Sequence, residues 1–171
     1  MPISLYDATI PTQIQMLNAA QGWMEKAKAS AIADEEIARA CLTQSMAPLA
    51  KQVHWMLAHS VGAIEALRKG EMNPQLDEPT TDLEKMRLNL GAAENQLRAL
   101  SVGELESFAG QEVRFAYEPH GVDVPFTAEN FLLSFAQPNF FFHCTTAYAI
   151  LRHIGLDLGK RDYLGQMRSA Q

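Results

Sequence analysis

The stretch TDLEKMRLNLGAAENQLRAL, residues 81–100, decides the fold class. Its apolar residues recur in alternating steps of three and four, which is the period of one face of an α-helix. Thr81 and Glu84 have the spacing of a capping box, so we expect the helix to begin there. The apolar stripe consists of Leu83, Met86, Leu90, Ala93, Leu97 and Leu100. A helix that buries one such stripe is typical of a helical bundle.

Two long helices are expected before this one, over residues 9–31 and 46–69. Gly70 directly follows the second of them and is a favourable residue for ending a helix. Beyond the third helix, Thr127 is the expected N-cap of a fourth, which ends at Gly155. Pro138 lies inside this last helix and predicts a kink or break, because proline has no N–H to donate.

The segments EVRFAY and VDVPF, between the third and fourth helices, alternate like strands and flank the turn-forming sequence EPHG. They predict a short β-hairpin. The expected fold is therefore all-α, a four-helix bundle with a short β-hairpin inserted between the third and fourth long helices. With 171 residues, the chain is expected to form a single domain over residues 1–171.

The composition of the chain argues against some classes of binding partner and indicates a cellular location. The net charge of −6, from 20 acidic and 14 basic side chains, argues against a nucleic-acid partner. No apolar run approaches the length of about 20 residues that spans a membrane, and the N-terminus has no signal-peptide pattern. We therefore expect a cytoplasmic protein with no membrane partner.

The second predicted helix carries a second apolar face, opposite its main stripe. Trp55, Ala58, Gly62 and Ala66 form this face. A tryptophan among small residues indicates packing against another helix, either in the same chain or across a dimer. A homodimer is the expected assembly.

Polar side chains on the second and fourth helices form the candidate site. His54 borders the apolar stripe of the second helix, while His143 heads an inward stripe on the fourth, with Asn139 one turn before it. Bundle cores hold metals on such side chains, and two imidazoles favour zinc or another borderline divalent ion. Alternatively, both are core or rim histidines hydrogen-bonded to Asn139, Thr145 or a backbone carbonyl. His59 lies on the small-residue face, where nothing nearby suggests a ligand set.

The stretch HCTTAYAILRHIG, residues 143–155, resembles a segment of the DinB-like (YfiT-like) four-helix bundles. That segment begins with a metal-ligand histidine and closes with an arginine and a glycine, here Arg152 and Gly155. The whole chain resembles a DinB-related bacterial and fungal family of unknown function. The stretches that carry this resemblance are ISLYDATIP, APLAKQVHWM, QPNFFFHCTTAYAILRHIG and GKRDYLG.

The resemblance implies one divalent metal, such as Zn, Ni or Fe, held by a histidine of the second helix and an HxxxH pair of the fourth. These positions correspond to His54, Asn139 and His143, so an asparagine replaces the first histidine of the pair. Characterised members of the DinB-like family include thiol-dependent S-transferases that activate the thiol on the metal, so the resemblance also implies an activity of this kind.

Two hypotheses about function follow. The first is a metal-binding protein or metal-dependent, thiol-transferase-like enzyme with an incomplete ligand set. The second is a metal-free helical-bundle dimer, without cofactor, that binds a small molecule or has a structural role. The phenylalanine run at residues 140–142, the eight methionines and the kink at Pro138 would form its apolar pocket.

Overall fold

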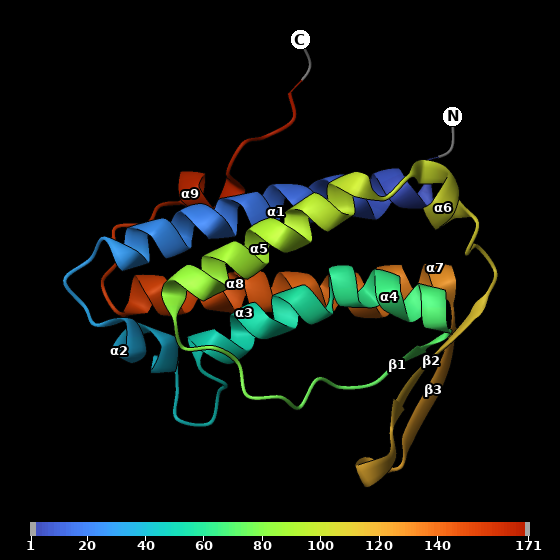
Figure 1. The fold of residues 1–171 in the computed structure, drawn as a ribbon, viewed down its shortest axis with the longest axis horizontal. Helices are drawn as coiled ribbons and strands as arrows, with labels where there is room; N and C mark the ends of the chain where they lie inside the picture. Colours follow the sequence, from blue (N-terminus) through green and yellow to red (C-terminus); the bar gives the residue numbers. More distant parts are fainter. Residues whose placement is uncertain (1–2, 170–171) are drawn as a thin grey trace.

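A computed structural model describes residues 3–169 of the protein (Figure 1). The chain is mostly helical and carries a small three-stranded sheet. The helices are α1 (Leu5–Lys28), α2 (Asp34–Arg39), α3 (Leu49–Ala58), α4 (Val61–Lys69), α5 (Leu83–Ala99), α6 (Val102–Glu106), α7 (Ala128–Asn130), α8 (Gln137–His153) and α9 (Lys160–Leu164). The strands are β1 (Glu71–Met72), β2 (Glu112–Tyr117) and β3 (Val122–Thr127).

The long helices pack in two pairs, α1 with α5 and α3 with α8 (Figure 1). The core lies between these pairs, where α1 also contacts α8 and α3 also contacts α5. Leu17, Met56, Leu90 and Phe140 have no exposed surface and come from the four different helices. The periodic stripe of residues 81–100 therefore faces this core, as its spacing predicts.

The two helices of the first pair begin at side-chain caps. The Ser4 hydroxyl accepts a hydrogen bond from the Asp7 N–H at 3.0 Å, so α1 begins before the predicted start at residue 9. Asp82 caps α5 and accepts from the backbone N–H groups of Glu84 and Lys85. The cap predicted at residue 81 is thus one residue off, because a carboxylate takes the role expected of the threonine.

The second predicted helix is divided at residues 59–60 into α3 and α4. The Ser60 hydroxyl donates to the Met56 carbonyl at 2.7 Å, and this carbonyl would accept the Ser60 N–H in a continuous helix. The predicted end is confirmed, since Gly70 closes α4 in the left-handed conformation at φ +77°. The chain therefore has a corner where one uninterrupted helix was expected.

Where a kink or break was expected around Pro138, the structure has a π-helical turn over Phe131–Ala136, directly before α8. The predicted cap is confirmed, because the Thr127 hydroxyl accepts from the Asn130 N–H. The Gln137 N–H then donates to the Leu132 carbonyl, five residues back, and α8 continues through the proline. The missing proline N–H is thus accommodated by a wider turn rather than by a break.

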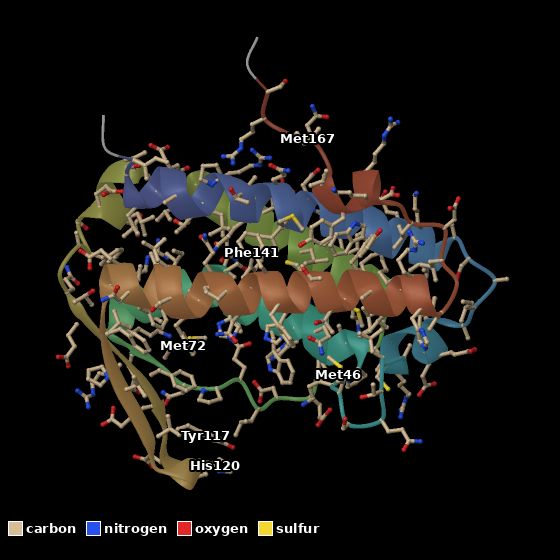
Figure 2. All side chains as sticks on the ribbon, turned by 180° about the vertical axis from the view of Figure 1, so that it is seen from behind. Met46, Met72, Tyr117, His120, Phe141 and Met167 are labelled. Atoms are coloured by element: carbon tan, nitrogen blue, oxygen red, sulfur yellow. The ribbon has the colours of Figure 1, made fainter. Side chains whose placement is uncertain are left out.

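The predicted hairpin is part of a larger, mixed sheet with the order β1–β2–β3. Strands β2 and β3 are antiparallel and pair Arg114 with Pro125, while β1 is parallel to β2 and pairs Met72 with Phe115. Strand β1 was not predicted, since two residues are too few for a strand pattern. Figure 2 shows Tyr117 and His120 at the far tip of the hairpin, away from the helices.

The C-terminal segment packs against α1. The Trp23 indole N–H donates to the Asp162 carbonyl at 2.8 Å, and its ring stacks on Tyr163 with centroids 5.8 Å apart. Gly165 turns the chain at φ +57°, where a Cβ would lie 2.9 Å from the Ala19 Cβ. This contact makes Gly165 the residue of the segment least tolerant of a side chain.

Replacing Gly165 with alanine is therefore expected to lower the free energy of unfolding by about 1–3 kcal/mol, through the positive φ and the overlap with Ala19. Gly103→Ala is the control, because nothing lies within 4 Å of the added Cβ and the residue is inside α6. Urea denaturation of both variants tests this. Equal stability of the two variants would contradict it.

Within residues 3–169, no helix is both long and apolar enough to cross a membrane.

Candidate functional site

A cavity of about 330 Å³ lies between α3, α8, the sheet and the loop that follows β1. Its walls are mainly aromatic and aliphatic, with a few amide and imidazole groups among them. The lining residues are Trp55, Ala58, His59, Met72, Pro74, Gln75, Leu76, Phe115, Phe135, Asn139 and His143. A cavity of this size, mostly apolar with few polar groups, has the composition of a small-molecule site.

Two rows of side chains at helical spacing bring α3 and α8 together here. On the α3 side, Trp55 and His59 are four residues apart, and His59 is the residue that ends the helix. On the α8 side, Phe135, Asn139 and His143 follow one another at intervals of four. The π-helical turn directly before α8 carries Phe135, so this irregular backbone forms part of the wall.

His143 is buried, with 7% of its surface exposed, and is held from one side by Gln52. Its Nδ1 lies 2.8 Å from the Gln52 Oε1, and the Gln52 Nε2 donates to the Ala47 carbonyl at 3.0 Å. Trp55 packs on the same imidazole, with ring centroids 5.1 Å apart. The ring is therefore fixed in position, and among residues 3–169 its Nε2 has no protein partner.

His59 lies beside His143, with ring centroids 5.6 Å apart and an angle of 17° between the ring planes. The Nδ1 of His59 is buried and has no hydrogen-bond partner in the described part of the chain. The pKa of each ring is lowered to about 4, mainly by burial, with a smaller contribution from the neighbouring His143 in the case of His59. Both imidazoles are therefore neutral at pH 7.

Asn139 supplies the third polar group. Its Nδ2 donates to the Phe135 carbonyl at 2.8 Å. The Oδ1 makes no hydrogen bond to another group within residues 3–169. The amide therefore contributes an oxygen acceptor to the cavity lined by the two histidines.

The structure brings Asn139 and His143 together but places His54 elsewhere. His54 lines a separate cavity of about 30 Å³ with Thr80 and Met86. Its Nε2 is buried without a partner among the described residues, and burial lowers its pKa. His59, for which the sequence pattern suggests no ligand set, lines the cavity in the place predicted for His54.

The donor set around the cavity fits a divalent cation poorly. Within residues 3–169, no three His, Cys, Asp or Glu side chains are arranged to hold an ion. His59 and His143 offer two nitrogen ligands, but the third candidate is a neutral amide rather than a histidine or carboxylate. For His59 to bind through Nε2, its proton would lie on the buried, unpartnered Nδ1, whereas metal-bound histidines donate that N–H to an acceptor. The metal site on His54, Asn139 and His143 stays a prediction.

Comparison with known proteins assigns the fold to a family. A crystal structure of a DinB family member protein from Shewanella denitrificans matches with a TM-score of 0.80 at 27% identity, over 98% of this chain and 95% of that chain. No curated protein gives a significant match. Residues 5–164 match the domain of unknown function DUF1993. The chain therefore belongs to the DUF1993 family and is a DinB-related protein with a DinB-like fold.

Proposed function

We propose that this protein, with α1, α3, α5 and α8 as its four-helix bundle, binds a small uncharged molecule in the cavity between α3 and α8. The observation that carries this proposal is that two neutral imidazoles and an amide without a partner for its oxygen line the same cavity, whose walls are aromatic. No charged side chain is among the lining residues of that cavity in the described chain. The second hypothesis from the sequence, a metal-free ligand-binding module, is thus the one that we favour.

The dimensions of the cavity support this proposal. A volume of about 330 Å³ holds a molecule with one aromatic ring and a short substituent, and lies at the lower end of the range of ligand sites. Phe115, Phe135 and Trp55 offer ring faces and edges for stacking. Titratable groups with displaced pKa values inside a cavity are also more frequent at functional sites than elsewhere.

Titration with p-cresol tests the proposal. The chain has two tryptophans, of which Trp55 lines the cavity and Trp23 lies under α9. In ¹H–¹⁵N spectra, p-cresol is expected to shift the Trp55 indole signal and to leave that of Trp23 unchanged, with a dissociation constant of about 1 mM. Ala58→Leu, which fills the cavity, is expected to abolish the shift.

His54→Gln is the matched control, because His54 lies outside the cavity and its variant is expected to bind p-cresol like the wild type. Equal shifts of the two tryptophan signals, or none, would contradict the proposal.

A divalent ion is the second candidate occupant, and the observation that favours it is the proximity of two neutral imidazoles. His59 and His143 would then be the nitrogen ligands, with Asn139 as an oxygen ligand. A bound ion would lower the pKa of a water or thiol held on it. Elemental analysis of protein purified without a His-tag distinguishes the candidates: one ion per chain that is lost in His143→Ala supports the metal, and substoichiometric metal unchanged by that substitution excludes it.

A further inference from the structure

We propose that Gln52 fixes the tautomer of His143, so that the cavity presents hydrogen-bond acceptors and selects uncharged ligands that carry a hydrogen-bond donor. This inference rests on the proposed function and specifies the chemical class of its ligand. It is carried by the hydrogen bonds that hold Gln52, His143 and Asn139 in place.

The chain of hydrogen bonds begins at the Ala47 carbonyl, which can only accept. The Gln52 amide therefore turns its Nε2 toward Ala47, at 3.0 Å, and its Oε1 toward His143, at 2.8 Å. An amide oxygen has no proton to give, so the proton of this hydrogen bond lies on the His143 Nδ1. In the neutral ring, the other nitrogen then carries a lone pair. The His143 Nε2 is thus an acceptor.

The orientation of the Asn139 amide is likewise fixed by a hydrogen bond to a backbone carbonyl. Its Nδ2 donates to the Phe135 carbonyl at 2.8 Å, and the Oδ1 is left as a second acceptor. The Nδ1 of His59 is buried, so its Nε2 is the nitrogen that a ligand can reach. No partner in residues 3–169 fixes the tautomer of His59, and this ring adapts to what is bound. The His143 Nε2 and the Asn139 Oδ1 are therefore two fixed acceptors, and each requires a donor from the ligand.

The residues that line the cavity disfavour the binding of a charged ligand. Among the described residues that line the cavity there is no Asp, Glu, Lys or Arg. A carboxylate or ammonium placed there would lose its hydration without gaining an opposite charge. A ligand without a donor would leave the His143 Nε2 and the Asn139 Oδ1 desolvated and unpaired, which also weakens binding. Phenols, neutral amides and indoles have the required combination of apolar body and donor.

A series of four small aromatics on the wild-type protein tests the ligand class. The probes are p-cresol with a hydroxyl donor, 4-methylanisole with an acceptor alone, toluene with neither, and the 4-methylbenzoate anion. Binding is followed at the Trp55 indole signal, with the Trp23 signal as the internal reference. We expect p-cresol to bind at least about tenfold more tightly than each of the other three, the factor that one unpaired acceptor costs.

The tautomer is measured independently of any ligand by ¹⁵N NMR of the imidazole nitrogens. In the wild type we expect a protonated Nδ1 and a bare Nε2 on His143. Gln52→Leu removes the acceptor and is expected to shift the ring toward the Nε2–H tautomer and to reduce the preference for p-cresol. Gln13→Leu is the matched control, because Gln13 is an equally buried glutamine of α1 outside the cavity lining.

The outcomes separate this inference from the function on which it rests. If all four probes shift Trp55 with similar affinity, the cavity binds ligands but does not select donors, and the inference is wrong. A protonated Nε2 on His143 in the wild type would overturn it as well, and this measurement does not depend on the folding of a variant. If no probe shifts Trp55 while His143 has the expected tautomer, the proposed function itself fails.

Discussion

Replacing Phe140 with alanine is expected to lower the free energy of unfolding by about 3–5 kcal/mol, the typical cost of truncating a fully buried phenylalanine. Phe140 has no exposed surface, whereas Phe142 of the same phenylalanine run is 55% exposed. Phe140 points into the core between the helix pairs, so its loss would leave a cavity that the neighbouring helices fill only in part.

Phe142→Ala is the matched control, with the same chemistry on the same helix, and is expected to change the stability by no more than about 0.5 kcal/mol. Urea denaturation of both variants measures the difference. Similar losses in the two variants would show that α8 does not face the core as described.

Acidification from pH 7 to pH 4 is expected to destabilise the protein by about 2 kcal/mol for each of His59 and His143, after allowance for water access to the rings. Both groups have a pKa lowered from 6.5 to about 4 in the folded protein, mainly by burial. Between these values the unfolded chain binds more protons than the folded one. The contribution is therefore fully present above pH 6.5 and is lost as the pH falls toward 4.

A double variant, His59→Gln with His143→Gln, isolates this effect from the carboxylates that titrate in the same range. The difference in unfolding free energy between wild type and variant is expected to change by about 3–4 kcal/mol from pH 7 to pH 4. Chemical denaturation at intermediate pH values gives the curve. Parallel curves for the two proteins would rule out a buried, neutral imidazole pair.

The long helices are predictable because each carries a local signal, whereas the short helices α6 and α9 are not among the expected elements. The stripe of residues 81–100 and the caps at Thr127 and Gly70 depend only on neighbouring residues. The corner at Ser60 and the π-helical turn before Pro138 were not predictable. The corner depends on the Ser60 hydroxyl binding the Met56 carbonyl, and the turn depends on how the backbone adapts to the missing N–H of the proline. Strand β1 forms because it pairs with β2, forty residues later in the chain. The sequence of so short a segment does not indicate such a long-range contact.

The candidate site was predicted in part. Asn139 and His143 lie in the cavity, but the histidine that joins them from the second predicted helix is His59 and not His54. A signal for the correct side existed, because Gln52, Trp55 and His59 recur at steps of three and four and share a face, whereas His54 does not. Trp55 and the small residues of that face predict a packing surface, whereas the buried polar residue Gln52 is the signal that indicates a site.

The homodimer expected from that face stays a prediction. Ala58 and Ala66 are 2% and 3% exposed within the single chain, so contacts of the same chain cover this part of the face, while Trp55 and Gly62 are partly exposed. Light scattering at micromolar concentration measures whether the protein is a monomer or a dimer.

A crystal structure of the tag-free protein with p-cresol tests the central claim most directly, because it reports both the occupant and its orientation. The predicted result is one p-cresol in the cavity between α3 and α8, its ring against Trp55 and Phe135, and its hydroxyl about 2.8 Å from the His143 Nε2. An ion bound between His59 and His143, or a p-cresol whose hydroxyl points away from His143, would contradict the account.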